Sequence, residues 1–347
     1  MRVLVTGHHG YIGSVVAPMV RDAGHEVVGL DTFYYRNCDF GSSAELEPAR
    51  EVDLRDVRAA DLDGFEAVIH LAALSNDPVG DLNTDWTYAI NLAGTIALAT
   101  AASEAGVRRF VFASSCSMYG AAEGDTPLDE KAALRPLTPY AESKVAAEEV
   151  LRELSSRDFA PVSMRNATAY GVSSRLRLDV VLNNLVAWAH TTGAIRLQSD
   201  GSSWRPLVHV RDIGFATIAL LQAPEELVRG EAFNIGSARQ NYRIRDLAEV
   251  VHERLPSCDI TFAPEASADP RSYRVDFSKF EAAFPDCRFE WTAERGVDEL
   301  VSAFQTVGLT YEDFDSHRYI RLGQLRRLLD EGALNQDLRW VAPPDRR

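Results

Sequence analysis

A glycine-rich turn near the start of the chain, placed between an apolar run and a helical pattern, constrains the fold more than any other feature. Residues 2–6 form an apolar run typical of a buried strand, and glycines follow at positions 7, 10 and 13. Apolar residues then recur at helical spacing over residues 11–23. Glycines let the backbone turn tightly and bring the helix close to the strand. This order predicts the first unit of a doubly wound α/β sheet.

The same alternation continues along the chain. Runs that are apolar on both faces and alternate with helices are typical of a parallel sheet covered on both sides. We therefore predict a Rossmann-type doubly wound domain over residues 1–172, with residues 206–236 packing back on it, and a smaller lobe over residues 173–347 that ends in a helical extension. The predicted strands cover residues 25–31, 51–54, 67–71, 109–114, 161–164, 207–210 and 232–235, and the main helices cover 86–105, 140–154, 180–192, 212–222 and 319–329.

Composition excludes several classes of function. A formal net charge of -15 disfavours nucleic acid or an anionic membrane as a partner, because both require a cationic face. The four cysteines include no C-x-x-C pair, so we expect neither a disulfide framework nor a metal site. The first residues already fit a strand, and no apolar run is long enough to span a bilayer. We expect a soluble, cytoplasmic protein without a targeting segment.

The glycine turn also predicts a dinucleotide site. Its loop amides and the N-terminus of the following helix are suited to bind a pyrophosphate. Asp31 closes the second predicted strand, where a carboxylate accepts hydrogen bonds from both adenosine ribose hydroxyls and repels a 2′-phosphate, which favours NAD over NADP. The nearby Arg36 and the alternative of an ordinary turn aspartate leave this preference open. We expect Asp53 and Leu54 to face the adenine.

Three residues fit an oxidation of an alcohol. Tyr140 and Lys144 lie four positions apart on a predicted helix that begins after Thr138, so they share one helix face. A neighbouring ammonium group stabilises the phenolate that a tyrosine needs to act as a base. Ser115 follows a predicted strand, at the sheet edge where ligands bind. Each residue taken alone also fits a solvated helix face or a strand end, and the glycine turn upstream favours the catalytic interpretation.

Together these motifs resemble the extended short-chain dehydrogenases/reductases, the nucleotide-sugar epimerase/dehydratase family, up to about residue 303. The resemblance implies a Rossmann domain that holds NAD, a C-terminal lobe that holds a nucleoside-diphosphate sugar, and Ser115, Tyr140 and Lys144 as catalytic residues. It further implies a homodimer formed through the helices predicted at 86–105 and 140–154. The segments that carry it also include His70-Leu71-Ala72-Ala73, Asn91-Leu92-Ala93-Gly94-Thr95, Phe233-Asn234-Ile235-Gly236 and Val275-Asp276-Phe277-Ser278-Lys279.

The resemblance implies a role for further residues around the cofactor. Asn91 is expected beside the catalytic site and Ser75 near the nicotinamide ribose. The cofactor-binding residues are predicted to be Gly7, Gly10, Tyr11, Ile12, Gly13, Asp31, Asp53, Leu54, Leu71, Ala72, Ala73, Ser75, Asn91, Tyr140 and Lys144.

Two positions after the catalytic serine separate the reactions of this family. Members that eliminate water resemble S-T-D-E-V-Y-G, where the Asp and Glu act as acid and base. This chain has Cys116 and Ser117 there, and neither replaces a carboxyl group at neutral pH. The 3,5-epimerising reductases have a cysteine two places before the tyrosine, whereas Cys116 lies three places before Tyr119, so an inert thiol is favoured.

The remaining chemistry is 4-epimerisation through a transient 4-keto sugar, without net change in NAD. The alternatives are an NAD(P)H-dependent ketoreductase of a deoxysugar nucleotide, which uses the same residues, and a non-catalytic NAD-binding protein on the same fold.

The expected substrate is a nucleoside-diphosphate sugar, whose diphosphate requires cationic groups. Arg205 matches the family's D-G-x-x-x-R motif and Arg271 its D-x-R-x-Y motif. The usual substrate asparagine is replaced by Thr168. Residues 306–347 lie outside the resemblance, and we expect their apolar helix face to pack on the body, with a substrate lid or a dimer contact as alternatives. The predicted substrate-binding residues are Ser115, Ser117, Asn166, Thr168, Asn183, Arg205 and Arg271.

Overall fold

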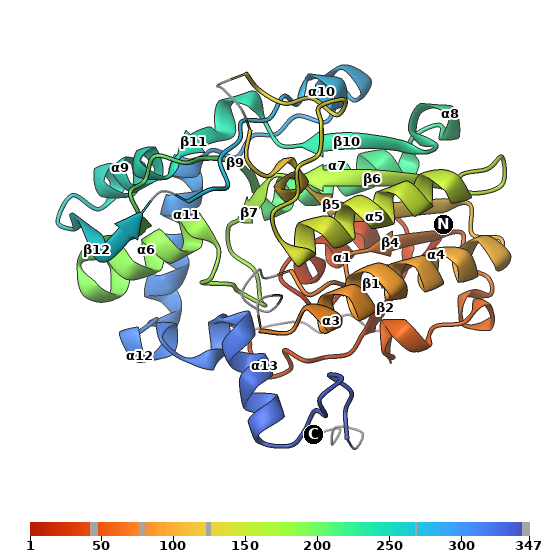
Figure 1. Ribbon diagram of the computed structural model, residues 1–347, viewed down its shortest axis with the longest axis horizontal. Coiled ribbons are helices and arrows are strands. Elements are labelled where there is room, and N and C mark those ends of the chain that lie inside the picture. The colour runs from red at the N-terminus through yellow and green to blue at the C-terminus, as the bar shows by residue number, and fades with distance from the viewer. Residues whose placement is uncertain (42–47, 76–79, 81, 123–125, 268, 342–347) are drawn as a thin grey trace.

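A seven-stranded sheet forms the larger lobe of the computed structural model, which describes residues 1–41, 48–75, 80, 82–122, 126–267 and 269–341 (Figure 1). The strand order is β10-β6-β5-β4-β1-β2-β3, and every neighbouring pair is parallel. This confirms the predicted Rossmann-type α/β fold. The strands are β1 (Arg2–Thr6), β2 (Glu26–Asp31), β3 (Ala49–Glu51), β4 (Ala67–His70), β5 (Arg109–Ser115), β6 (Ala160–Asn166) and β10 (Glu231–Ile235).

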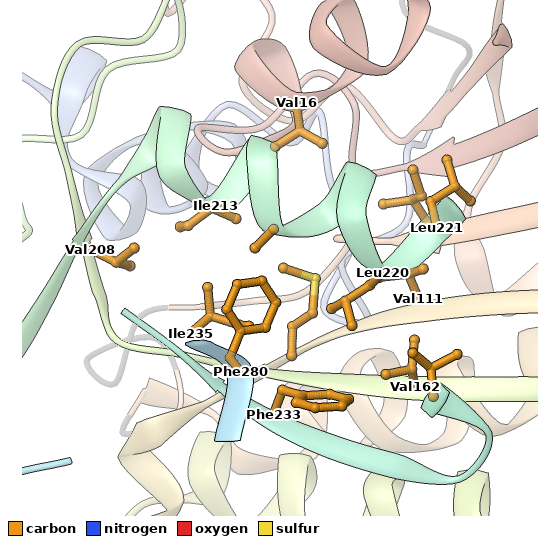
Figure 2. Packing of buried hydrophobic residues seen from close by; sticks show 14 of the residues in the cluster. Val16, Val111, Val162, Val208, Ile213, Leu220, Leu221, Phe233, Ile235 and Phe280 are labelled. Carbon is orange, nitrogen blue, oxygen red and sulfur yellow. The ribbon is translucent and has the colours of Figure 1, made fainter. Parts of the chain in front are cut away.

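Helices cover both faces of this sheet (Figure 1). On one face, Val16 and Leu220 belong to the same buried cluster as Val111 of β5 (Figure 2). On the other face, Leu98 and Leu151 share a buried cluster with the strand side chains that point to that face of the sheet. The first face carries α1 (Gly13–Asp22) and α7 (Val210–Gln222), and the second carries α4 (Gly94–Glu104) and α5 (Pro139–Leu154).

The order in which the chain adds strands to the sheet reverses at β1. From β1 it runs outward through β2 and β3, then returns to the other side of β1 at β4. In such folds, ligands bind in the crevice outside the carboxyl ends of the strands at this point. The glycine turn follows β1 and the His-Leu-Ala-Ala segment follows β4, so both lie at that crevice.

A smaller lobe contains a three-stranded sheet, a two-stranded sheet and several helices. Its core includes Leu182 and Leu185 of α6 (Val181–Thr192), which packs with α9 (Ile244–Arg254) and α11 (Ala293–Val307). Of residues 206–236, the strand β9 belongs to this lobe, whereas α7 and β10 join the larger one. The other elements of this lobe are β7 (Thr168–Tyr170), β8 (Ala194–Ser199), β9 (Trp204–His209), β11 (Asn241–Arg243), β12 (Asp259–Ser267), α12 (Tyr311–Phe314) and α13 (Arg321–Asp330). Two short helices, α8 (Glu225–Val228) and α10 (Ser278–Ala283), pack against β10 of the larger sheet.

Two predicted elements differ in detail. The strand predicted at 51–54 is β3, which ends at Glu51, because the Asp53 carboxylate caps the 3₁₀ turn η1 (Leu54–Asp56) and stops the extended run. The helix predicted at 86–105 is divided into α3 (Thr84–Thr87), a π-helical stretch η3 (Tyr88–Ala93) and α4. π-Helical turns are frequent at functional sites, and this one contains Asn91.

The C-terminal extension packs on the body of the protein, as predicted. Leu325 and Leu328 of α13 are buried in a cluster that includes Tyr34 and Trp86 of the larger lobe. Further along, Leu338 completes the same cluster. The segment therefore runs along the lobe that contains the glycine turn, and not only along its own lobe. Within the described part of the chain, no helix has both the length and the apolar character needed to cross a membrane.

Candidate active site

Only glycine fits at the two ends of the glycine turn. Gly7 has a φ of 71°, and a Cβ there would lie 2.6 Å from the backbone nitrogen of Ala72. A Cβ on Gly13 would lie 2.0 Å from the carbonyl oxygen of Gly7. This close packing leaves the start of α1 open to a ligand, which fits the pyrophosphate of a dinucleotide. Gly7, Gly10, Tyr11, Ile12 and Gly13 all line one large cavity.

Asp31 orients the glycine turn and lines the same cavity. Its Oδ2 accepts a hydrogen bond from the backbone of His9 at 3.0 Å, and its Oδ1 accepts one from Phe33 at 2.8 Å. A carboxylate oxygen has a second lone pair, so both can still accept from ribose hydroxyls. Arg36, the residue that left the choice of NAD open, donates to Glu51 at 2.9 Å and is not among the lining residues.

The adenine end of the predicted site is held by ion pairs. Asp53 and Leu54 line the cavity, as do Leu71, Ala72, Ala73 and Ser75 after β4. The Asp53 carboxylate accepts from Arg55 through Nε and Nη2, at 2.9 and 2.6 Å, and lies 3.3 Å from Arg339 of the C-terminal segment. These cationic partners lower the pKa of Asp53 against the effect of its burial.

Asn91 does not line the cavity, which corrects the expectation that it contacts the cofactor. It is fully buried, and both ends of its amide bond the backbone of Leu74: Oδ1 accepts at 2.8 Å and Nδ2 donates at 3.0 Å. A buried amide with its partners satisfied in this way fixes the loop after β4. Asn91 is therefore a positioning residue for the cavity wall.

The three predicted catalytic residues come together at the carboxyl edge of the sheet and all line the cavity. Ser115 ends β5, and its Oγ accepts from the backbone of Ser117 at 3.1 Å. Tyr140 lies in the first turn of α5, which the hydroxyl of Thr138 caps as predicted, accepting from Ala141 at 3.2 Å. The strand end and the helix start therefore set the positions of the serine and the tyrosine.

Lys144 is buried beneath these residues. Its side chain donates to the carbonyl of Ala113 at 2.7 Å and lies 4.5 Å from the ring centre of Phe112. Burial lowers the pKa of its ammonium group to about 7. The amine can therefore exchange a proton near neutral pH, which is the range in which general acid-base groups work best.

Unpartnered polar atoms surround the catalytic residues. Among the described residues, Oγ of Ser114, Oγ of Ser117 and Oδ1 of Asn166 are buried without a hydrogen-bond partner, and all three residues line the cavity. Buried polar atoms normally have partners, so these atoms are suited to a polar ligand such as a sugar. Cys116 differs, since its thiol donates to the carbonyl of Arg165 at 3.0 Å and is not among the lining residues. Burial raises the pKa of this thiol, as expected for an inert cysteine.

A second group of charged residues lies in the smaller lobe. Arg205 and Arg271 both line the cavity, and both bond the carboxylate of Asp269, at 2.7 and 2.9 Å. Asp269 thereby holds two guanidinium groups side by side, and paired guanidinium groups suit a diphosphate. Thr168 also lines the cavity.

Asn183 does not reach the cavity, which corrects its prediction as a substrate contact. The residue is fully buried; its Oδ1 accepts from Gly171 at 3.0 Å, and its Nδ2 donates to the hydroxyl of Tyr11 at 3.1 Å. Its neighbour Asn184 lines the cavity instead. The sequence places the two asparagines side by side, and only the rotation of α6 decides which one faces inward.

Several lining residues were not predicted from the sequence. Arg177 and Asp179 follow β7, and Arg321 begins α13. The alternation of charged and apolar residues at 175–179 is a signal that could have identified the first two, because it indicates one buried and one accessible face. Nothing in the local sequence marks Arg321. Together with the predicted residues, they enclose a continuous cavity of about 990 Å³.

Comparisons with known proteins agree with this geometry. Residues 3–236 match the sequence model of a protein family described as "NAD dependent epimerase/dehydratase family". The chain belongs to this family. It is 27% identical to the UDP-glucose 4-epimerase of Bacillus subtilis (strain 168) over 331 residues, which cover 86% of this chain and 94% of that protein. It is 31% identical to the UDP-glucose 4-epimerase of Mycolicibacterium smegmatis over 288 residues, with 80% and 90% covered.

A solved structure is similar over nearly the whole chain. The structure of MoeE5 in complex with UDP-glucuronic acid and NAD has a TM-score of 0.75 and 26% sequence identity, covering 88% of this chain and 99% of that one. NAD is therefore bound in a homologous structure of this family. The glycine turn, which lines the cavity and is packed too closely for a Cβ at Gly7 or Gly13, fits such a group.

Proposed function

We propose that this protein is an NAD-dependent nucleotide-sugar epimerase, which inverts C4 of its substrate through a transient 4-keto sugar. One observation carries the proposal. The cavity contains Ser115, Tyr140 and Lys144 but, among the described residues, no carboxylate that is free to act as acid or base in the elimination of water from a sugar. Relatives that are UDP-glucose 4-epimerases support this assignment.

Every carboxylate among the described lining residues is engaged away from the catalytic trio. Asp31 accepts from the glycine turn, and Asp53 is bound by Arg55. An elimination needs an acid for the leaving hydroxyl and a base for the carbon-bound proton. Cys116 and Ser117, in the positions of those groups, supply neither. The remaining two lining carboxylates are Asp179, which bonds Arg177 at 2.8 Å, and Asp269, which bonds Arg205 at 2.7 Å.

The chemistry of the proposed reaction is a proton transfer at a sugar hydroxyl. The phenolate of Tyr140 removes the proton, Ser115 orients the hydroxyl, and the ammonium form of Lys144 stabilises the phenolate. Bound NAD would supply the acceptor, and then the donor, of the hydride at the same carbon. Arg205 and Arg271 hold the diphosphate while the hexose turns to present its other face. Tyr140 then returns its proton to the new hydroxyl.

The ketoreductase alternative uses the same residues with external NAD(P)H. A preference for the 2′-phosphate of NADPH requires a free cation near Asp31, and Arg36, the candidate for that role, is bound by Glu51. The favoured cofactor is therefore NAD. Since relatives include UDP-glucose 4-epimerases and MoeE5 binds UDP-glucuronic acid, UDP-sugars are the first substrates to test. We further propose a homodimer through α4 and α5, which pack side by side in each subunit.

Incubation of the purified protein with UDP-, dTDP-, GDP- and CDP-hexoses, with products identified by NMR, tests the proposal. The expected result is inversion at C4 with no net formation of NADH. A product that has lost water would contradict it in favour of a dehydratase, and stoichiometric use of NADPH would favour the reductase. The Tyr140→Phe variant provides the control for contaminating activity.

A further inference from the structure

Two buried arginines lie on the cavity wall outside the catalytic and diphosphate groups described above. The side chain of Arg177 donates to Oγ of Ser75 at 3.0 Å, and the guanidinium of Arg321 lies 4.0 Å from the ring centre of Tyr35. Tyr35 follows β2 and Ser75 follows β4, the two neighbours of β1 in the sheet. The arginine pair therefore spans the carboxyl end of β1, where the glycine turn begins α1.

The backbone beside these arginines is attached directly to that turn. Ser173 donates its hydroxyl to the carbonyl of Tyr11 at 2.7 Å, and Asn183 bonds both the hydroxyl of Tyr11 and the carbonyl of Arg177. Arg321 is joined to the same backbone, because its Nη2 donates to the carbonyl of Arg175 at 2.8 Å. Helix α1 has ten residues, and Ile12 and Gly13 at its N-terminus line the same cavity as the two arginines.

The charges in this region do not balance within the described residues. Asp179 bonds Nε of Arg177 at 2.8 Å and accepts from the backbone nitrogen of Arg321 at 3.3 Å, so one carboxylate lies beside two buried guanidinium groups. The Nη1 of Arg321 is buried without a hydrogen-bond partner among the described residues, and the residue is only 5% exposed. Burying two cations beside one carboxylate is costly, because that single charge compensates only one of them. An anionic ligand in the cavity would supply the missing partner.

The helix that carries Arg321 lies outside residues 3–236, which match the family. The segment after it is held on the larger lobe by two tryptophans: Trp86 donates to the carbonyl of Gln336 at 2.6 Å, and Trp340 donates to the carbonyl of Thr32 at 2.7 Å. Thr32 follows Asp31, the predicted ribose acid. The extension therefore closes along the part of the cavity assigned to the adenosine and pyrophosphate.

We propose that residues 317–341 form a clasp over the dinucleotide, and that Arg321, together with Arg177, binds the pyrophosphate of NAD. The clasp supplies a cation from a segment beyond the family's matched region, so that release of the cofactor requires this segment to open. The proposal concerns retention of the cofactor and does not depend on which sugar the protein converts.

The variant Arg321→Gln tests the proposal, with Arg326→Gln, an exposed arginine on the same helix, as the matched control. Calorimetric titration of the nucleotide-free proteins with NAD and, separately, with UDP gives the readout. Loss of a charge-assisted hydrogen bond predicts NAD binding about tenfold weaker in R321Q, with wild-type binding in R326Q and unchanged UDP affinity in both. Wild-type affinity of R321Q for NAD, or weaker binding of UDP alone, would overturn the proposal.

Hydrogen exchange of the unmodified protein keeps the test independent of the folding of R321Q. Addition of NAD is expected to slow amide exchange in residues 317–341, while UDP alone leaves it unchanged. Exchange in this segment that does not respond to NAD would show that the extension is only a structural brace and would overturn the clasp.

Discussion

The amine of Lys144 lies 5.6 Å from the ring centre of Tyr140, one helical turn away on α5. The same amine donates to Ala113 of β5, the strand that ends at Ser115. One helix start and one strand end therefore set the positions of all three groups of the proposed reaction. Because the strand is in the centre of the sheet and the helix packs on it, this geometry does not depend on a mobile loop.

Replacement of Tyr140 by phenylalanine tests the proposed base. The variant keeps the ring and removes only the hydroxyl, so we expect kcat for epimerisation to fall by about a thousandfold while NAD and UDP affinities are retained. Steady-state turnover, measured by NMR, checks the prediction. Tyr311→Phe, at an exposed position on α12, is the control and should behave as wild type. Full turnover in the Tyr140 variant would mean that another group removes the proton.

The buried lysine predicts a pH dependence of stability in the nucleotide-free protein. The pKa of Lys144 is about 7 in the folded protein, compared with 10.5, the ordinary value of a lysine, which applies to the unfolded chain. Below pH 7 the amine is charged in both states, and the cost of burying this charge is fully present. Above pH 7 the folded protein releases the proton while the unfolded chain keeps it, so the free energy of unfolding rises with pH, by at most about 1.4 kcal/mol per unit.

Urea denaturation of wild type and Lys144→Met between pH 6.5 and 9.5 measures this effect. Methionine fills a similar volume without a titrating group, so the difference in the free energy of unfolding between the two proteins should change with pH in favour of wild type. A constant difference across this range would show that Lys144 has an ordinary pKa in the folded protein.

The two arginines around Asp269 should differ in their importance for substrate binding. The side chain of Arg205 is 11% exposed, whereas that of Arg271 is 39% exposed. A charge in a less solvated position interacts more strongly with a diphosphate. We expect Arg205→Gln to raise KM for the nucleotide sugar by about thirtyfold and Arg271→Gln by only a fewfold, both with little change in kcat. Equal rises in KM would contradict the predicted difference between the two arginines, and an unchanged KM or effects on kcat alone would contradict a diphosphate-binding role.

A buried ion pair beneath the site should dominate the local stability. Arg165 and Glu148 have side chains 8% and 9% exposed, and Arg165 bonds both carboxylate oxygens. Glu148→Ala leaves a buried guanidinium without its anion, and we expect a loss of about 3 kcal/mol in the free energy of unfolding. Glu225→Ala, which removes the shared partner of the solvent-accessible Arg108 and Arg229, should cost less than about 1 kcal/mol. Urea denaturation of the two variants measures both losses in the free energy of unfolding. Similar losses would show that the buried ion pair contributes no more to stability than the exposed one.

The predicted site residues that line the cavity are adjacent to the ends of elements. Gly7, Ser115 and Tyr140 could be placed in one site from the sequence, because the ends of parallel strands and the starts of their helices meet at one sheet edge. The same rule identified Asp31 as a lining residue. The rotation of a side chain does not follow from this rule. Asn91 and Asn183 therefore lie behind the lining residues Leu74 and Tyr11, to which they are hydrogen-bonded, and do not line the cavity themselves.

The sequence by itself therefore determined the family, the sheet and the order of chemical groups along the edge, since these depend on local periodicity and on spacing within single elements. Tertiary structure alone decided which charges face one another. Asp269 joins Arg205 to Arg271, and Arg321 reaches Tyr35 from 286 positions further along the chain. Contacts at such separation depend on how the lobes pack, because no local pattern specifies the partner of a buried charge.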